Sequence, residues 1–470
     1  MSGYNRGLMA PPTEARDRER VSTIDDLLEP LFGACKPASE FRIGAEAEKL
    51  GLSERSLVPM QYDGPRGVVA VMRELERHHG WRAEEGDGPL LALEKAGASV
   101  TLEPGAQLEL SGAPLADVHL IALEFEEHMR ELEKVSDALA PAFGGERIAW
   151  LGMGFHPLAK QADLSWVPKP RYGIMRRFLP ARGAYGLDMM RRTATVQANF
   201  DYASEAHAMQ CLRVGLRLAP FFTAMFASSP FYEGAPFGGK SYRARVWLDV
   251  EPARQGLVPA VLHEGSRFVD YVEWALDAPM FLLLRDGKVK ENTGQSFRSF
   301  MKHGFEGELA TRGDWVTHLN TLFPEVRLKR TLEIRGGDSL PRELVVAPSA
   351  LFAGIFYDEA ALAQAGSLTE SFRHDELVEL RRRVAERGLE ADFRGRPAGE
   401  IASRMIEIAK GGLSRRARLA NGVDEGVHLL AVERSTAKLR SPADDLLDRA
   451  REYGGGPDAV ARASLEICRL

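Results

Sequence analysis

The sequence predicts an α+β fold, with strands in the first two-thirds of the chain and helices in the last third. Five segments before residue 340 alternate polar and apolar residues with the two-residue period of a half-buried strand. From about residue 341 onward the pattern is almost wholly helical, and this segregation argues against repeated strand–helix–strand units. No long linker interrupts the chain. We expect one large domain over 21–470, with a sheet-forming part at about 21–340 and a helical part at about 341–470.

Composition and charge are those of a globular protein. The 470 residues are 44% hydrophobic and 27% charged, and the formal net charge is −6. This mild acidity argues against a nucleic-acid partner, because a phosphate-binding groove is usually basic. No apolar run in the sequence reaches a membrane-spanning length, so no membrane association is expected.

The cysteines and the first residues bear on the cellular compartment. Cys35, Cys211 and Cys468 are too scattered for a metal motif or a disulfide framework, which is typical of a reducing compartment. Residues 1–20 lack the apolar core of a secretion signal and contain several acids, so we expect a flexible tail there. These observations favour a cytoplasmic protein.

Helical periodicity identifies the elements around the strands. Thr23 stands before acidic residues as a helix start, and Gly80 follows a periodic segment as a helix stop. The longest helical patterns are amphipathic, and the one after Ser204 is mostly apolar. The predicted helices are 23–32, 66–80, 114–143, 204–230, 341–365, 368–388, 398–411, 441–453 and 457–468.

Each predicted strand has one polar and one apolar face, because successive side chains alternate. For a single strand, a solvated polar face is the simpler interpretation. Two features favour a functional site instead: the polar faces hold Glu, Gln, Asn and Arg without Lys, and small residues beside them leave room for a ligand. The strands and their polar residues are 41–52 with Glu46 and Glu48, 101–110 with Glu103, Gln107 and Glu109, 193–202 with Thr195, Gln197 and Asn199, 241–250 with Arg243 and Arg245, and 331–338 with Glu333 and Arg335.

If these strands share one sheet, glutamates crowd its polar face. Repulsion between adjacent buried carboxylates is on the order of several kcal/mol unless cations neutralise them. Oxygen ligands suit Mg²⁺ or Mn²⁺, and Mg²⁺ combines a few carboxylates with substrate phosphates. The arginines would bind the remaining phosphate or carboxylate oxygens, so the pattern favours phosphoryl transfer. The candidate metal ligands are Glu46, Glu48, Glu103, Glu109 and Glu333, and the candidate oxyanion ligands are Arg243, Arg245 and Arg335.

A second motif suggests another class of protein. The segment "GAPFGGKS", Gly234 to Ser241, fits the phosphate-binding loop pattern GxxxxGK[ST]. That loop requires a strand before it and a helix after it, whereas the pattern here predicts a helix before and a strand after. We expect a flexible loop near the arginines, and a nucleoside triphosphatase built on Gly234–Ser241 is the alternative.

The same segments resemble glutamate–cysteine ligases of the plant and proteobacterial type. The resemblance covers roughly residues 20 to 450 in consistent order, and "MMRRTATVQANFDY" is its most specific block. It implies a curved, mainly antiparallel sheet that forms an active-site funnel wrapped by helices, as in the glutamine synthetase superfamily. It also implies that ATP, L-glutamate and L-cysteine give γ-glutamylcysteine through a γ-glutamyl phosphate, with Mg²⁺, in the first step of glutathione synthesis. The other matching segments include "FRIGAEAEKLG", "TLEPGAQLELSG", "SYRARVWLDVEP" and "LFPEVRLKRTLEIRGGDS".

The resemblance also implies residue roles. Arg243, four residues before Trp247, is similar to the arginine that binds the glutamate α-carboxylate, and Arg335 to the one that faces the transferred phosphoryl group. With Glu46 they form the predicted catalytic set. Arg245, Thr195 and Asn199 are expected near glutamate or nucleotide. The predicted metal positions are Glu46, Glu48, Glu103, Glu109, Gln197 and Glu333.

Several alternatives stay open at this stage. A γ-glutamyl ligase of the same superfamily with another amine acceptor, or one that feeds another thiol pathway, would show the same segments. A catalytically inactive binding protein is a further alternative. The expected partners are small molecules, and the protein is expected to be a monomer or a homodimer. The three cysteines match no regulatory disulfide of the plant enzymes, and the N-terminal extension is shorter than that of a chloroplast precursor, which favours a bacterial cytoplasmic enzyme.

Overall fold

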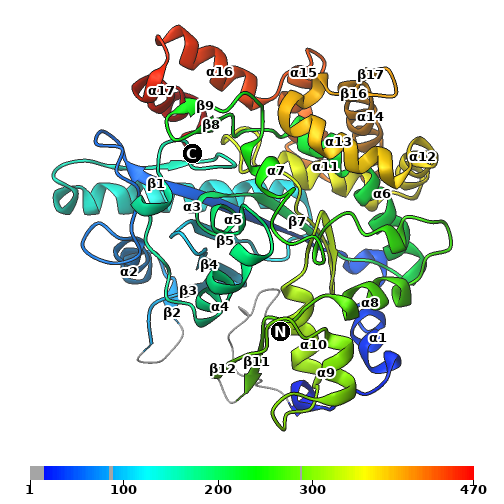
Figure 1. The fold of residues 1–470 in the computed structure, drawn as a ribbon. Helices are drawn as coiled ribbons and strands as arrows, with labels where there is room; N and C mark the ends of the chain where they lie inside the picture. The colour runs from blue at the N-terminus through cyan, green and yellow to red at the C-terminus, as the bar shows by residue number, and fades with distance from the viewer. Residues whose placement is uncertain (1–14, 84–87, 286–287) are drawn as a thin grey trace.

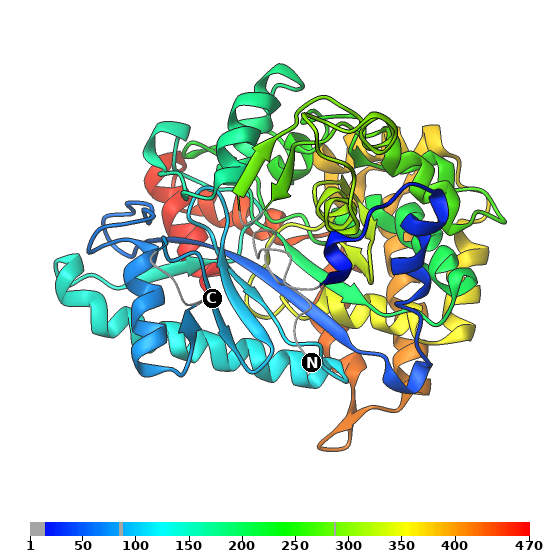
Figure 2. The ribbon, with the colours of Figure 1, turned by 90° about the horizontal axis from the view of Figure 1, so that it is seen from below.

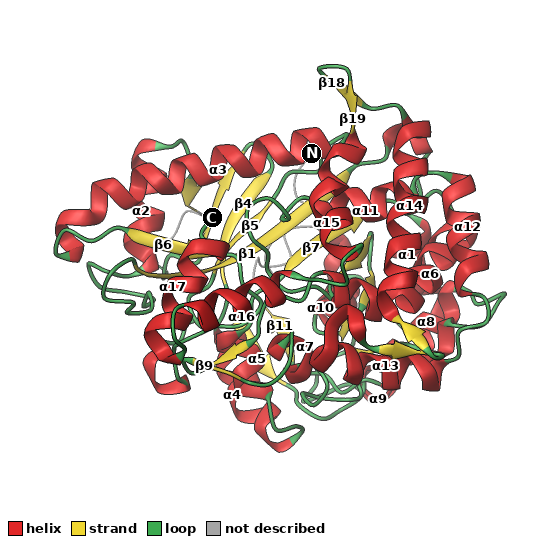
Figure 3. Cartoon of the chain, turned by 90° about the horizontal axis from the view of Figure 1, so that it is seen from above, coloured by secondary structure: helices red, strands yellow, loops and turns green. Residues whose placement is uncertain are grey.

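The computed structural model describes residues 15–83, 88–285 and 288–470 (Figure 1). Most of the predicted N-terminal tail, residues 1–14, lies outside these described ranges. Ala15–Arg18 form a 3-10 helix, and Arg20 makes an antiparallel bridge with Thr311. Figure 3 shows strands in the middle of the molecule with helices around them. The α+β class and the mainly antiparallel sheet are therefore confirmed.

A sheet of nine strands, counted over the described residues, forms the centre of the fold. Its neighbours pair antiparallel in the order β14-β15-β7-β1-β5-β4-β3-β2, and β6 pairs with the end of β1. β1 is the longest and runs through the middle of the molecule (Figure 2). The strands are β1 (Ile43–Ser53), β2 (Arg82–Ala83), β3 (Ala92–Lys95), β4 (Ala98–Leu102), β5 (Leu108–Ser111), β6 (Ile148–Leu151), β7 (Val196–Phe200), β14 (Val326–Leu328) and β15 (Leu332–Ile334).

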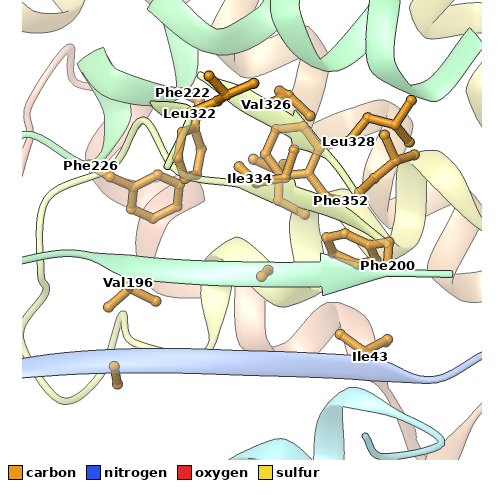
Figure 4. Close-up of a cluster of buried hydrophobic side chains, with 14 of the residues drawn as sticks. Ile43, Val196, Phe200, Phe222, Phe226, Leu322, Val326, Leu328, Ile334 and Phe352 are labelled. Atoms are coloured by element: carbon orange, nitrogen blue, oxygen red, sulfur yellow. The ribbon is translucent and has the colours of Figure 1, made fainter. Parts of the chain in front are cut away.

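The apolar face of the sheet packs against helices. Val196 and Phe200 of β7 lie between Ile43 of β1 and the aromatic rings of Phe222 and Phe352 (Figure 4). Phe222 belongs to α6 (Glu205–Met225) and Phe352 to α11 (Ala347–Phe356), so helices from both predicted parts share one core with the sheet. The long helix α3 (Val118–Leu139) packs beside β1. This arrangement leaves the opposite, polar face of the central strands for the site.

The remaining helices surround this core. The predicted helix 341–365 is interrupted after α11, because Asp358 caps a new helix by accepting a hydrogen bond from the N–H of Ala361. In the described residues, no helix is long and apolar enough to cross a membrane. The other helices are α1 (Ile24–Phe32), α2 (Val68–His78), α4 (Pro170–Phe178), α5 (Gly186–Arg192), α7 (Tyr242–Val246), α8 (Phe268–Asp277), α9 (Phe297–His303), α10 (Arg312–Asn320), α12 (Glu359–Thr369), α13 (His374–Arg387), α14 (Ala398–Arg416), α15 (Leu430–Thr436), α16 (Pro442–Glu452) and α17 (Gly456–Cys468).

Short two-stranded pairs complete the fold, and some of them interrupt the helical part, where no strand was predicted. Most of them pair two residues with two, whereas β11 and β12 pair over four residues each. The strands are β8 (Phe231–Tyr232), β9 (Ala235–Pro236), β10 (Gln255–Gly256), β11 (Leu282–Arg285), β12 (Lys288–Glu291), β13 (Phe323–Pro324), β16 (Asp392–Phe393), β17 (Arg396–Pro397), β18 (Leu419–Ala420) and β19 (Val423–Asp424).

The predicted strand 241–250 is wrong, because its first half is the helix α7. Ser241 precedes this helix and accepts a hydrogen bond from the N–H of Ala244 at 2.9 Å, as an N-cap does. Tyr242 and Val246 are both buried, and their spacing of four residues suits one face of a helix as well as one face of a strand. The alternation alone did not distinguish the two.

The predicted single strand 101–110 is also wrong, because it is a hairpin of β4 and β5. The chain turns at Pro104 and Gly105, and Ala106 has a φ of 67°, in the left-handed region. A Cβ atom on Gly105 would lie 2.3 Å from the carbonyl oxygen of Arg191, so this position needs glycine. Glu103 consequently lies in the turn, whereas Glu109 lies in β5.

Candidate active site

Three buried glutamates of the polar face come from neighbouring strands. Glu46 and Glu48 point to the same side of β1, because they are two residues apart. Glu109 of β5 stands directly opposite Glu48 in the antiparallel register. The three residues are at most 9% exposed. The sequence prediction that these carboxylates lie together on one face of a sheet is therefore confirmed.

Neighbouring polar groups hold these carboxylates in place. The side-chain amide of Asn199 donates to Glu46 Oε1 at 2.8 Å, and the backbone N–H of Thr195 donates to Glu48 Oε2 at 3.0 Å. Thr101 of β4 donates its hydroxyl to Glu109 at 2.6 Å. Neutral donors of this kind orient a carboxylate but do not neutralise its charge.

The electrostatics of the group follow from burial and crowding. Burial, followed by the charges of Glu333 and Glu109, raises the pKa of Glu46 to about 8. Burial, followed by the charges of Glu103 and Glu109, raises the pKa of Glu48 well above its usual range. The pKa of Glu109 is also raised, first by burial and then by Glu103. The group therefore binds either protons or a cation.

Glu103 acts on this group from a position that the sequence did not predict. Its backbone N–H donates to the carbonyl of Gln107 across the β4–β5 turn, at 3.0 Å. Although the turn separates it from the strand face of Glu109, its charge still raises the pKa of both Glu48 and Glu109. The β4–β5 hairpin thus places Glu103 near the other carboxylates, although Glu103 does not lie on the strand that was predicted for it.

The donor chemistry of this group suits a hard divalent cation, but its present geometry is incomplete. Within the described ranges, no set of three or more His, Cys, Asp or Glu side chains is arranged to hold a metal ion. Mg²⁺ usually takes only one or two carboxylates and completes its coordination with water and substrate phosphates. Crowded carboxylates with raised pKa values fit such a partial site, which substrate oxygens would complete.

A cationic group adjoins the carboxylates on β14 and β15. Glu333 is fully buried and accepts two hydrogen bonds from the Arg327 guanidinium, at 2.7 and 2.9 Å, and one from Lys329 at 2.6 Å. Arg335 also pairs with Glu333, and it donates to the side-chain oxygen of Gln197. Burial opposes ionisation of Glu333, but the charges of these cations hold its pKa well below the usual range.

Arg243 and Arg335 meet at a pocket next to this group. Arg243 is 4% exposed, and its Nη2 donates to the backbone carbonyl of Arg335 at 3.0 Å. Asp338 fixes the start of α7 by accepting hydrogen bonds from the hydroxyls of Ser229 and Ser241, at 2.6 and 2.8 Å. The pocket is lined by Thr223, Arg243, Ala244, Trp247, Leu248, Gly256, Phe323, Pro324, Glu325, Arg335, Gly336, Arg381 and Val384.

Other predicted residues are placed differently from Arg243. Arg245 is exposed beside the ring of Tyr242, because residues two apart on a helix face different sides. It therefore does not share the pocket of Arg243, and its role in substrate binding stays a prediction. The Thr195 hydroxyl donates to the carbonyl of Gly337 at 2.7 Å and supports the segment after Arg335.

Basic residues near the carboxylates were missed by sequence reasoning. Lys169 is half-buried near the β4–β5 turn and donates to the carbonyl of Leu102 at 2.7 Å. Its pKa is lowered to about 8, first by burial and then by Arg171. The alternation of Arg327 and Lys329 with apolar residues was a usable signal, whereas Lys169 and Arg171 come from a segment that no strand pattern marked.

The lysine and the last two backbone N–H groups of the loop Gly234–Ser241 are bound to other parts of the protein. A short helix follows it, so the predicted element order was wrong, but the N–H groups of Lys240 and Ser241 both donate to the carbonyl of Ala385 at 3.0 Å. The Lys240 ammonium pairs with Asp444. Both the backbone donors and the lysine of the motif are thus occupied by protein acceptors.

Comparison with known proteins adds an independent finding. The model of the family described as glutamate-cysteine ligase family 2 matches residues 42–463. The chloroplastic glutamate–cysteine ligase of Brassica juncea is 38% identical over 457 residues, which is 96% of this chain and 86% of that protein. The chloroplastic enzyme of Arabidopsis thaliana is 38% identical over 96% of this chain and 84% of its own length. Ligase B of Oryza sativa subsp. japonica is 38% identical over 93% of this chain and 86% of its own.

Two further results of the comparison concern structure and location. The solved structure of the ligase PafA, in complex with the ubiquitin-like protein Pup, matches 91% of this chain and 73% of its own chain. The TM-score is 0.44 and the identity is 10%, which is too low to establish a shared fold. The expected cytoplasmic location is contradicted, because the relatives named above are chloroplastic proteins. Amino-acid composition reports a reducing environment but does not distinguish between reducing compartments.

Proposed function

Since this chain belongs to glutamate–cysteine ligase family 2, we propose a division of roles among the residues that line its site. The chain is a glutamate–cysteine ligase, which joins glutamate to cysteine in the first step of glutathione synthesis. The observation that carries the proposed roles is that two oppositely charged groups lie close together on one sheet face, with Gln197 of β7 directly opposite Glu46 and bound to Arg335. Buried carboxylates on β1 and β5 adjoin Arg335, which reaches Gln197 of β7.

The carboxylates would hold Mg²⁺, or Mn²⁺, together with ATP. Glu46, Glu48, Glu103 and Glu109 are the proposed ligands. The raised pKa values of Glu46, Glu48 and Glu109 reflect uncompensated negative charge, and the charge of Glu103 contributes to the shift of Glu48 and Glu109. When bound, the metal would neutralise the triphosphate. Gln197 and Glu333 are proposed at the border of this site. Glu333 would have to exchange one of its present cationic partners for the metal.

The arginines would act on glutamate and on the transferred group. We assign Arg243 to the α-carboxylate of glutamate and Arg335 to the equatorial oxygens of the transferred phosphoryl group. A γ-carboxylate oxygen of glutamate would attack the γ-phosphorus of ATP as the bond to ADP breaks. The cysteine amine would then attack the acyl carbon and expel phosphate. Positioning and charge stabilisation are sufficient for such a transfer, and no covalent bond to the enzyme is required.

A coupled assay tests this proposal. Purified protein is incubated with ATP, Mg²⁺ and glutamate, and phosphate release is followed across a panel of amines that includes cysteine. We expect phosphate release that depends on cysteine and matches γ-glutamylcysteine formation mole for mole. Chelation of the metal should abolish turnover, and addition of Mg²⁺ or Mn²⁺ should restore it. ATP turnover without cysteine, or turnover in excess chelator, would contradict the proposal.

A further inference from the structure

The pocket beside Arg243 and Arg335 contains an acidic residue for which the roles above give no explanation. Glu325 lies between β13 and β14 and lines this pocket. The pocket is open to solvent at its mouth. Trp247 and Phe323 form an aromatic wall, with ring centroids 5.7 Å apart. Glu325 is the one acid among three arginines in the described lining, and its carboxylate could pair with a positive group of a ligand.

One carboxylate oxygen of Glu325 is held by the helical part of the chain. Arg381 of α13 donates from Nε and Nη2 to Glu325 Oε1, at 2.9 and 2.6 Å. The side chains of this ion pair are 12–14% exposed. A pair this enclosed has a well-defined geometry, because both donors of the guanidinium fork converge on the same oxygen.

The second carboxylate oxygen of Glu325 is available to a ligand. Oε2 accepts no hydrogen bond from any residue that the structure describes. It packs over Gly336, another residue of the pocket lining, where a Cβ atom would come within 2.4 Å of it. Because Glu325 is only half-buried, its Oε2 can accept a charge-assisted hydrogen bond from a ligand in the pocket.

Unused donors line the same pocket. In the described ranges, the buried Nε of Arg243 and the indole Nε1 of Trp247 have no hydrogen-bond acceptor. Both residues belong to α7 or its end, and the Arg243 guanidinium lies 5.8 Å from the Trp247 ring. The pocket therefore presents donors on one side and a carboxylate oxygen on the other. An α-amino acid carries the complementary pair, a carboxylate next to an ammonium group.

We propose that Glu325 binds the α-ammonium group of the glutamate substrate, and that Arg381 positions Glu325 for this contact. The proposal rests on the function given above, in which Arg243 binds the α-carboxylate. The indole N–H of Trp247 would assist Arg243, and the γ-carboxylate would extend toward Arg335, which lines the same pocket. Glu325 would then select an α-amino dicarboxylate over one without the amino group, because a ligand without it forms no charged hydrogen bond with Glu325 Oε2.

The test compares glutamate with glutarate, which lacks only the α-amino group. Initial rates with saturating ATP, Mg²⁺ and cysteine give the KM for glutamate, and competition gives the inhibition constant for glutarate. Wild-type protein should bind glutarate at least about tenfold more weakly than glutamate. In Glu325→Gln the KM for glutamate should rise about 10- to 100-fold, the factor for a charged hydrogen bond, while the constant for glutarate changes less than about threefold.

Matched variants separate recognition from damage to the fold. Arg381→Gln should raise the KM for glutamate by a smaller factor, again without a change for glutarate, whereas Arg382→Gln on the exposed side of α13 should change neither. If Glu325→Gln has a lowered thermal midpoint, Glu325→Asp, which keeps the charge, is used for the same comparison of glutamate with glutarate. An equal loss of affinity for glutamate and for glutarate, or an unchanged KM for glutamate, would overturn the inference. A wild-type protein that forms no γ-glutamylcysteine would instead overturn the proposed function.

Discussion

Glu48 of β1 and Glu109 of β5 stand directly opposite each other in an antiparallel pair, and both are buried. Like charges in directly opposed positions destabilise a sheet. Among the described residues, neither carboxylate has an ion pair like the one between Arg327 and Glu333. Their hydrogen-bond donors are neutral: the Thr101 hydroxyl donates to Glu109, and the Thr195 backbone N–H donates to Glu48. A protein that retains this pair at the centre of its sheet therefore requires a proton or a bound cation there.

Replacement of Glu46 by Gln tests the carboxylate group directly. We expect Glu46→Gln to lower kcat at least about 100-fold, the scale for loss of a group that stabilises charge in the transition state. Stability should be unchanged or higher in metal-free protein, because the change removes a charge that burial and two nearby glutamates oppose. Steady-state rates and the thermal midpoint measure the two effects. Exposed Glu343 provides the matched control, Glu343→Gln, with neither effect.

The pH dependence of stability should depend on metal. The pKa of Glu46 is about 8 in the folded chain, above the value of 4.5 for a free glutamate. Folded protein thus binds more protons than unfolded protein between these pH values, so the free energy of unfolding falls as pH rises, by up to about 1.4 kcal/mol per pH unit for each proton. Denaturant titrations at pH 5 to 8 with chelator should show this fall, and Glu46→Gln should reduce it. A flat profile in chelator would contradict the prediction, as would failure of Mg²⁺ to stabilise the protein at pH 8.

Glu333 is expected to be essential for stability as well as for activity. Glu333→Gln would leave Arg327, Lys329 and Arg335 without the carboxylate that each contacts. Removing one partner of a buried ion pair typically costs about 3–5 kcal/mol. Urea denaturation should show a loss of this size. The control Glu379→Gln removes an exposed pair with Arg383 and should cost at most about 1 kcal/mol. Similar losses in the two variants would refute the buried-pair account.

The central part of the site could be predicted because it depends on strand periodicity alone. Glu46 and Gln197 lie side by side in register on β1 and β7, and both were placed on polar faces from their spacing. The same rule failed for Arg243 and Arg245, since Tyr242 and Val246 fit either a strand or a helix. The helix is instead selected by long-range contacts, in which Asp338 accepts hydrogen bonds from Ser229 and Ser241, 109 and 97 residues upstream.

The remaining parts of the site required the folded structure. Glu103 and Glu109 are brought near each other by the turn at Gly105. The backbone of Gly105 lies so close to Arg191 that no side chain would fit there. Lys169 reaches the carbonyl of Leu102 across 67 residues of sequence, and Arg381 comes from the helical part to Glu325. A local pattern contains no information on such pairings, because each depends on how distant elements pack.

Lys240 tests whether the loop pattern GxxxxGK[ST] takes part in catalysis. The Lys240 ammonium pairs with Asp444, and the two side chains are 19% and 17% exposed. A partly exposed pair of this kind contributes at most about 1 kcal/mol, so Lys240→Ala should lower stability by no more than that. The kcat and the KM for ATP should change less than about threefold, since the N–H groups of Lys240 and Ser241 are bound to the carbonyl of Ala385 and contribute no phosphate contact. Asp444→Ala should cost more stability than Lys240→Ala, because the Asp444 carboxylate also accepts hydrogen bonds from the backbone N–H and the hydroxyl of Ser441 at the start of α16, at 2.9 and 3.0 Å. Complete loss of ATP turnover in Lys240→Ala, with the fold intact and Asp444→Ala active, would show that this loop binds the nucleotide after all.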